Sequence, residues 1–137
     1  MQDINHTAEL KRNLKALRKR KIQVGILGDS EIAMYAGANE FGVTNKIPER
    51  SFLRTSFDDK KTVNRIVKEA QKAFDIRENP KMIMDRIGLL MTAAIQKKIR
   101  SNIPPPNAPS TRKRKRGKDK TLIDTGRMLR AVTHEII

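Results

Sequence analysis

The chain has 137 residues, of which 37% are hydrophobic and 33% charged, and this suits one small domain with a single modest core. The absence of cysteine excludes disulfides, thiolate metal sites and thiol catalysis, and no apolar run approaches the about 20 residues that cross a bilayer. The net charge of +15 favours an acidic partner, and with only 4% aromatic residues, contact with duplex phosphates fits better than stacking on single-stranded bases.

The N-terminal region predicts an amphipathic helix over about 7–20. Leu10, Leu14 and Leu17 recur at spacings of four and three, so they share one face. The opposite face is basic and carries Lys11, Arg12, Lys15, Arg18 and Lys19. Basic residues crowd the last turn, where the helix dipole favours positive charge. The residues before this helix hold no apolar block, so we expect no signal peptide.

A strand and a short helix are expected next. Hydrophobic β-branched residues alternate over 22–26, which is typical of a strand. Ser30 is then placed to cap a short helix that closes near Gly42. A loop follows over 43–51 and is interrupted by Pro48.

Two longer helices are predicted over 58–74 and 80–102. Their apolar residues recur three and four apart, as on the buried face of a helix. Pro80 suits the first helical position, where its missing N–H costs nothing. The expected core residues are Val63, Ile66, Val67, Ala70 and Phe74 in the first helix, and Ile83, Ile87, Leu90, Met91, Ala94 and Ile99 in the second.

The segment 103–120 predicts an exposed, mobile and basic arm. Its proline run cannot lie inside a helix, and seven of the eleven residues over 110–120 are basic. The segment has few apolar side chains to bury, so the interpretation without a function is disorder or a solvated run of charges. The functional interpretation is contact with DNA phosphates or a partner protein, and a targeting signal is a third possibility. The candidate contact residues are Arg112, Lys113, Arg114, Lys115, Arg116, Lys118 and Lys120.

The C-terminal region predicts a short helix and a last strand. The helix opens at Asp124-Thr125-Gly126, and the strand is indicated by alternation over 132–136. The two strands can pair antiparallel, so we expect an α+β fold over 1–137: a small antiparallel sheet packed with several helices, plus the extended basic arm at 103–120. A two-stranded sheet is barely stable alone, so helices must cover it or neighbouring subunits extend it.

Few residues indicate catalysis. Asp124-Thr125-Gly126 matches the active-site tripeptide of aspartic proteases, but that chemistry needs two carboxylates and a largely β framework. A helix cap with a turn glycine is the favoured interpretation. Glu40 and Glu49 are isolated carboxylates, and His6 and His134 have no spaced partner for a metal. These residues therefore show no clear catalytic or metal-binding arrangement.

Several short segments stand in a fixed order along 24–136. They are Tyr35-Ala36, Asn39-Glu40-Phe41-Gly42, Ile47-Pro48-Glu49-Arg50-Ser51-Phe52-Leu53-Arg54, Pro105-Pro106-Asn107, Pro109-Ser110-Thr111 and Leu122-Ile123-Asp124-Thr125-Gly126-Arg127-Met128. Each segment alone is weak, but the series resembles the tail-completion and virion-morphogenesis family of small neck proteins of tailed bacteriophages.

The resemblance implies a structural virion protein, made in the host cytoplasm, that forms a ring, commonly a hexamer. It also implies no enzyme activity, no metal and no cofactor. The ring would lie in the neck, between the head connector and the tail, around the DNA channel. The implied partners are other copies of the chain, a head connector or stopper protein, a tail terminator or tail-tube protein, and genomic DNA held by nonspecific electrostatics, with no membrane. The implied loop and interface residues are Phe41, Pro48, Arg50, Phe52, Asp124, Thr125 and Gly126.

Two other functions remain open at this point. A free, sequence-nonspecific nucleic-acid-binding protein would bind duplex tightly and with strong salt dependence, although no recognition helix of a helix-turn-helix is visible. An aspartic protease would lose its activity on Asp124→Asn.

Overall fold

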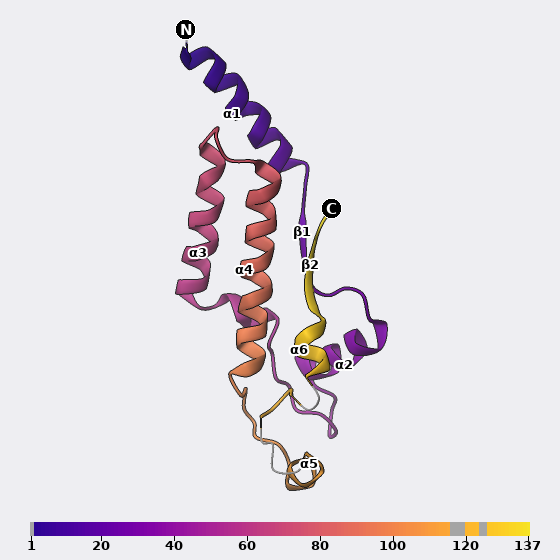
Figure 1. The fold of residues 1–137 in the computed structure, drawn as a ribbon. Helices are drawn as coiled ribbons and strands as arrows, with labels where there is room; N and C mark the ends of the chain where they lie inside the picture. The colour runs from indigo at the N-terminus through magenta and orange to yellow at the C-terminus, as the bar shows by residue number, and fades with distance from the viewer. Residues whose placement is uncertain (1, 116–119, 124–125) are drawn as a thin grey trace.

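The computed structural model describes residues 2–115, 120–123 and 126–137. The elements lie along an elongated molecule, with α1 projecting from one end and α5 at the other (Figure 1). In chain order they are α1 (Gln2–Arg18), β1 (Ile22–Ile26), α2 (Ser30–Phe41), the 3-10 turn η1 (Arg54–Phe57), α3 (Lys60–Gln71), the 3-10 turn η2 (Lys72–Phe74), α4 (Pro80–Arg100), α5 (Pro109–Arg114), α6 (Arg127–Ala131) and β2 (Val132–Ile136). The expected α+β class is confirmed.

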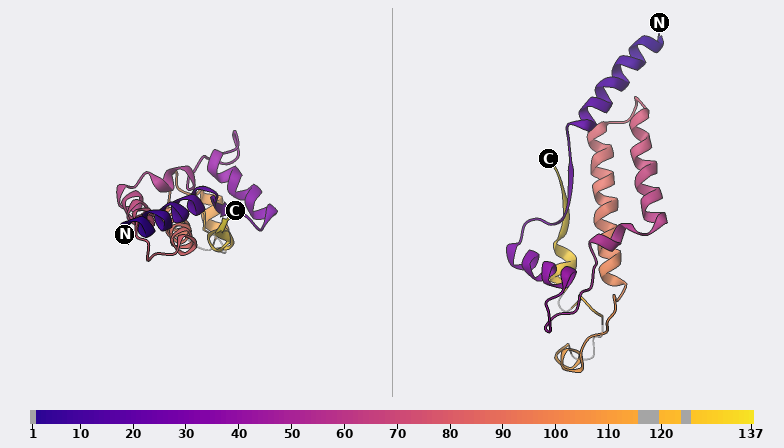
Figure 2. Two further views of the ribbon diagram at one scale, coloured as in Figure 1. Left: turned by 90° about the horizontal axis from the view of Figure 1, so that it is seen from above. Right: turned by 180° about the vertical axis from the view of Figure 1, so that it is seen from behind.

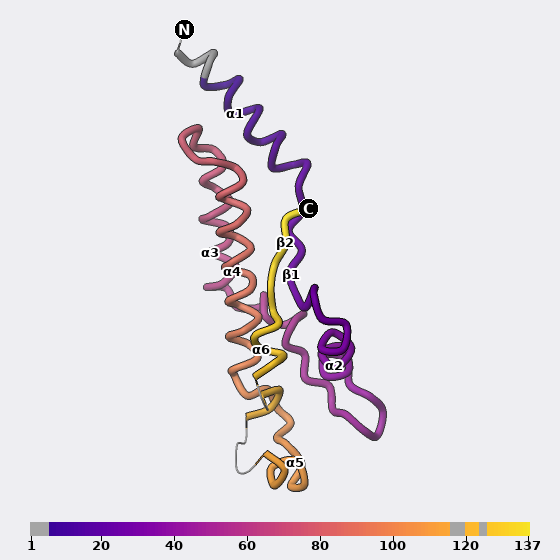
Figure 3. Tube along the Cα trace, turned by 45° about the vertical axis from the view of Figure 1, so that its right-hand side comes forward, coloured from indigo at the N-terminus to yellow at the C-terminus, as the bar shows by residue number. Residues whose placement is uncertain are grey.

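The two strands form the expected antiparallel sheet. Ile22 pairs with Ile136 and Ile26 pairs with Val132, so the first strand of the chain lies beside the last one (Figure 3). The alternating apolar residues of both strands face α4, which contacts both strands. The opposite face presents exposed polar side chains such as Thr133. A single long helix therefore covers one face of the sheet and leaves the other open.

Polar side chains set where the helices begin. Asp29, rather than Ser30, caps α2, because its carboxylate accepts a hydrogen bond from the Ile32 amide at 3.0 Å. The prediction of Ser30 as the cap was wrong by one residue. Asp59 caps α3 in the same way, so that helix begins at Lys60 rather than at 58. Before α4, the Asn79 side chain accepts from the amide of Lys81.

The core is built around the C-terminal half of α4. Ile95 and Ile99 are fully buried there and pack among Phe52, Met128 and Val132. The predicted stripe is confirmed at Ile83, Ala94 and Ile99, which are all buried, whereas Ile87, Leu90 and Met91 are only half-buried. Ile95 was not expected in the core.

The prediction for α3 was wrong for most of its stripe. Val63, Val67 and Phe74 are exposed, and so is Ala70. The side that packs against α4 instead includes Glu69, Ala73 and the half-buried Ile66. The carboxylate of Glu69 enters this interface because it pairs there with Arg86 and Lys72. The helix is therefore rotated from the predicted orientation, and its most apolar side faces solvent.

The extended basic arm is not confirmed. Residues 109–114 form α5, and Lys115 is buried, with its Nζ donating to the carbonyl oxygens of Lys120 at 2.8 Å and Ile123 at 2.9 Å. Thr121 is only 1% exposed and donates from Oγ1 to Ile103 O at 2.8 Å. The buried side chains of Lys115 and Thr121 are thus satisfied by hydrogen bonds to nearby backbone carbonyl oxygens, and composition alone does not predict these bonds. Four predicted residues lie outside the described residues: Arg116, Lys118, Asp124 and Thr125.

Candidate functional site

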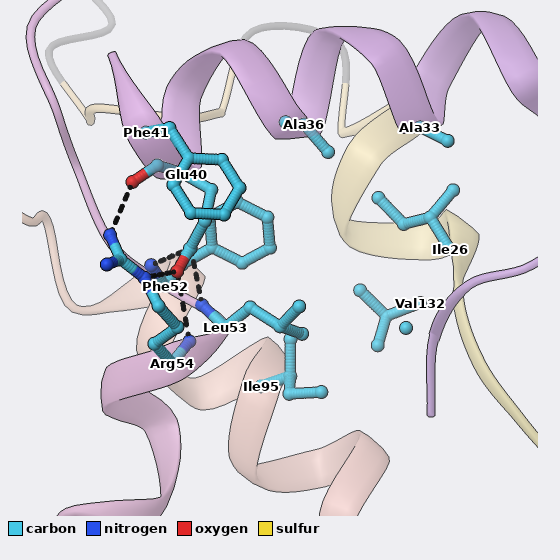
Figure 4. A pocket seen from close by; sticks show the side chains of 12 residues that line it. Ile26, Ala33, Ala36, Glu40, Phe41, Phe52, Leu53, Arg54, Ile95 and Val132 are labelled. Atoms are coloured by element: carbon cyan, nitrogen blue, oxygen red, sulfur yellow. Dashed lines mark hydrogen bonds and ion pairs between the residues drawn. The ribbon is translucent and has the colours of Figure 1, made fainter. Parts of the chain in front are cut away.

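The carboxylate of Glu40 organises the loop that follows α2. The last turn of α2 carries Glu40 into the interior, and the chain returns over 48–53 to wrap around it. Oε1 accepts from Ser51 Oγ at 2.8 Å, from Arg54 Nε at 2.7 Å and from the Arg54 amide at 3.1 Å. Oε2 accepts from the amides of Phe52 and Leu53, both at 2.9 Å (Figure 4). We call Glu40 with 51–54 the Glu40 clasp.

The clasp keeps Glu40 ionised. Burial alone would raise the pKa of this carboxyl, which is only 2% exposed. The hydrogen bonds donated by the Leu53 amide, by Arg54 and by Ser51 outweigh burial and lower the pKa to about 2. A carboxylate that is ionised at neutral pH and already accepts five hydrogen bonds is an anchor for the loop rather than a proton carrier.

Arg54 joins the clasp to the surface. Its Nη2 donates to Glu49 Oε1 at 2.7 Å and to the Glu40 carbonyl oxygen at 3.1 Å. Its guanidinium carbon also lies 4.8 Å from the centre of the Phe41 ring, which is a cation–π distance. Phe41 is 66% exposed, so Arg54 holds an aromatic ring at the surface of the molecule.

Arg50 links the same loop to the proline segment. Its backbone amide donates to Asn39 O at 2.7 Å. Its side chain is buried and donates from Nε to Pro105 O at 2.9 Å and from Nη2 to Pro106 O at 3.3 Å. Segments more than 50 residues apart in the chain are therefore bonded at the α5 end of the molecule (Figure 1).

An apolar cavity of about 210 Å³ lies beside the clasp, between α2, the sheet and α4 (Figure 4). Its lining includes Ala36, Phe52, Leu53, Ile95 and Val132. The charged residues at its wall, Glu40 and Arg54, are already bonded to each other. The lining therefore suits an apolar group.

The second feature is a basic surface on α1, which projects beyond the α3–α4 pair (Figures 2 and 3). Lys11, Lys15 and Arg18 recur at spacings of four and three, so they share one face, and the segment 11–21 holds seven basic residues and no acidic one. We define the α1 basic face as Lys11, Arg12, Lys15, Arg18 and Lys19. All five are exposed, and none forms an ion pair with a described residue.

The structure brings together part of the predicted site. Phe41, Arg50 and Phe52 meet around the Glu40 clasp, with Phe41 at the surface and the other two buried. Pro48 lies exposed on the same loop, and Gly126 precedes α6 with a left-handed φ of 79°. Among the predicted contact residues, Lys115 is buried, while the exposed ones in the described chain are Arg112, Lys113, Arg114 and Lys120.

Sequence reasoning missed the central residue of the clasp. Glu40 and Glu49 are not isolated, because both pair with Arg54. Their place in the sequence was the available signal, because Glu40 and Arg54 lie within two of the six segments quoted for the resemblance to neck proteins. Their pairing depends on a loop that returns to α2, and a one-dimensional pattern does not show that return.

Across the described ranges, no three His, Asp or Glu side chains are grouped so that they could hold a metal ion. None of the described helices combines the length and apolar character needed to span a membrane. Comparison of the chain with protein-family models, with curated proteins and with solved structures finds no match.

Proposed function

We propose that this chain is a structural subunit of the phage neck, which assembles into a ring around the DNA channel and joins the head connector to the tail. One observation carries the assembly part of the proposal: the chain exposes more solvent-accessible surface than a compact monomer of the same mass. The resemblance of its ordered segments to neck proteins then supplies the kind of assembly. The same segments build the Glu40 clasp and the Arg50 link, which is consistent with a structural role for them.

The size of the surface can be compared with expectation. The chain exposes 9834 Å², whereas a compact monomer of 15.6 kDa exposes about 7,200 Å². A ring member makes two contacts, and two interfaces of standard size bury about 1,600 Å² of its own surface. The excess of about 2,600 Å² is large enough to supply both contacts.

The test is assembly followed by complementation. The purified chain should form closed rings with a central channel in electron micrographs. Particles made without the chain should accumulate as DNA-filled heads and separate tails, and added chain should join them. A chain that stays monomeric at every concentration, or that leaves head–tail joining unchanged, would contradict the proposal.

The α1 basic face supports DNA contact as part of this function, and it also favours the alternative of a free nonspecific DNA-binding protein. Exposed lysines and arginines attract phosphates without reading base sequence. The two functions differ in assembly: a free DNA-binding protein would bind duplex tightly as a monomer, whereas the neck subunit should bind weakly until many copies share one duplex.

Changing Lys11, Lys15, Arg18 and Lys19 together to Gln should weaken binding to random-sequence duplex equally for all sequences. Each lost phosphate contact lowers the slope of log K against log salt by about 0.9, so we expect a loss of about 2–4 in the slope. Fluorescence anisotropy over a salt series measures it. The matched control changes Arg112, Lys113, Arg114 and Lys120 to Gln, and an equal loss there would contradict a specific role for α1.

A further inference from the structure

The helix α2 presents two large apolar side chains to solvent, Met34 and Phe41, the second of which also contacts Arg54. Met34, Gly37, Ala38 and Phe41 recur at i, i+3, i+4 and i+7, which places them in one stripe. Met34 is 78% exposed and Phe41 is 66% exposed. The two residues between them, Gly37 and Ala38, are small and half-buried, and Gly37 and Phe41 also line the cavity beside the clasp. In a chain with 33% charged residues, this stripe, which we call the α2 outer face, is an unusual apolar surface.

A second exposed apolar stripe lies on α3 and η2. Val63, Val67, Ala70 and Phe74 recur at spacings of four, three and four, so they share one side of the helix. Val67 is 46% exposed and Phe74 is 67% exposed. We call these four residues the α3 outer stripe. It is separate from the side around Ile66 that packs on α4.

The two stripes lie on opposite flanks of the molecule. The views in Figures 1 and 2 place α3 on one side of α4 and α2 on the other. They therefore do not cover each other within one chain. Two different apolar surfaces on opposite flanks form the arrangement of a head-to-tail contact, which repeats from copy to copy and closes into a ring when the rotation allows.

The charges on the two helices favour this pairing over like-with-like contacts. The exposed charges of the two helices differ in sign. On α2 the exposed charged side chain is Glu31, because Glu40 is buried in the clasp, whereas α3 exposes Lys60, Lys61, Arg65 and Lys68 and buries Glu69. An α2–α3 contact between copies brings opposite charges together, and an α3–α3 contact brings together two strongly positive surfaces. The α2 outer face spans about 10 Å at 1.5 Å per residue and fits within the length of the α3 outer stripe, which is about 16 Å.

We propose that a second copy of this chain occupies each stripe, so that the α2 outer face of one subunit packs on the α3 outer stripe of the next. The inference rests on the proposed ring and identifies its contact. Each contact removes exposed aromatic and aliphatic side chains from water on both partners. The contact uses two surfaces per subunit, which accounts for apolar surface on both flanks of a highly charged chain.

Single charged substitutions test the pairing. Met34→Glu and Val67→Glu should each abolish rings, because each variant loses one of the two surfaces. Mixed in equal amounts, the variants should form a dimer of one copy each and nothing larger, since the mixture retains one intact pair of surfaces. Analytical ultracentrifugation measures these states. Thr133→Glu, on the exposed face of the sheet, is the matched control and should still form rings, and melting curves check that each variant is folded.

The outcomes separate this inference from the proposed function. If the wild type forms rings and both variants form them as well, the α2–α3 contact is overturned and the ring proposal stays intact. Loss of rings in only one variant, or a mixture that stays monomeric, would also overturn the contact. A wild-type chain that never assembles would overturn both proposals.

Cross-linking provides a second measurement in a folded, assembled chain. Because the chain has no cysteine, Met34→Cys and Val67→Cys introduce the only thiols. A short bismaleimide should convert the double variant into a ladder of linked chains under denaturing conditions, whereas each single variant should stay unlinked. A double variant that assembles but gives no ladder would overturn the proposed contact.

Discussion

Glu40→Gln is expected to lower the free energy of unfolding at pH 7 by about 3 kcal/mol. The clasp lowers the pKa of Glu40 from an ordinary 4.5 to about 2, and each pKa unit corresponds to about 1.4 kcal/mol of preference for the ionised form. The amide of Gln also directs N–H donors toward the backbone amides of Phe52 or Leu53, which are donors themselves. Urea unfolding of wild type and variant measures the difference.

The effect of Glu40→Gln should depend on pH in a defined direction. Because the pKa of Glu40 is lower in the folded chain than in the unfolded chain, ionisation stabilises the fold above about pH 5. That stabilisation is lost as the pH falls toward 2. The pKa values of Asp59, Glu69 and Asp75 are lowered as well, by hydrogen bonds to their partners, but these groups are present in both proteins. The wild-type advantage should therefore be constant from pH 5 to 8 and vanish near pH 2.

Glu49→Gln is the matched control, because Glu49 also pairs with Arg54 but lies exposed at the surface. An exposed ion pair contributes about 0–1 kcal/mol, so this variant should remain close to wild type at every pH. Equal losses for the two variants would show that Arg54, rather than the buried carboxylate, holds the loop. A neutral Glu40→Gln would remove the clasp as a source of stability.

The elements that sequence predicted well are those whose apolar residues meet the core directly. Alternation predicted β1 and β2, and the three-and-four spacing predicted α4, because α4 packs along the sheet with Ile99 fully buried. The boundaries were less accurate, since caps such as Asp29 compete with a neighbouring Ser30 that has similar chemistry. Periodicity thus reports the buried face of an element more reliably than its first residue.

The failures concern charged residues that are paired at a distance. On α3, the spacing rule placed Val67 in the core, but Glu69 is buried instead, because Arg86 lies across from it on α4. At the clasp, Glu40 is buried by donors that arrive from a loop eleven to fourteen residues later. In the basic segment, Lys115 reaches carbonyl oxygens that a composition argument does not count. Each case depends on a three-dimensional partner, so the local pattern alone was insufficient.

The exposed apolar stripe on α3 has the same origin, because burial of Glu69 rotates the helix from its predicted orientation. A strongly amphipathic helix normally buries its most apolar side within its own chain. On α3 the side that packs against α4 holds the Glu69–Arg86 ion pair, so the apolar side around Val67 remains available to a neighbouring molecule. An apolar helix side that is exposed in the monomer is expected where that side packs on another molecule. The exposure of this side of α3 therefore agrees with the proposed contact between copies.

Gly88→Ala should destabilise the chain by about 2 kcal/mol, although alanine favours a helix over glycine by about 1 kcal/mol. Gly88 is buried where α4 crosses β2, and an added Cβ would lie 2.7 Å from His134 Cγ and 2.8 Å from His134 Nε2. The ring is held there by a 3.3 Å contact between its Nδ1 and Thr92 Oγ1. The methyl group therefore displaces the His134 ring or pushes β2 away from α4.

The same clash predicts a rescue. In the Gly88→Ala background, His134→Ala should restore stability, so that the double variant is more stable than the sum of the two single effects by at least about 1 kcal/mol. Gly37→Ala is the matched control, because this glycine is also helical but its added Cβ meets no atom within 4 Å. All variants are measured with Met34→Glu so that assembly does not contribute. Gly37→Ala should raise stability slightly, and additive effects at Gly88 and His134 would show that α4 and β2 do not pack through this pair.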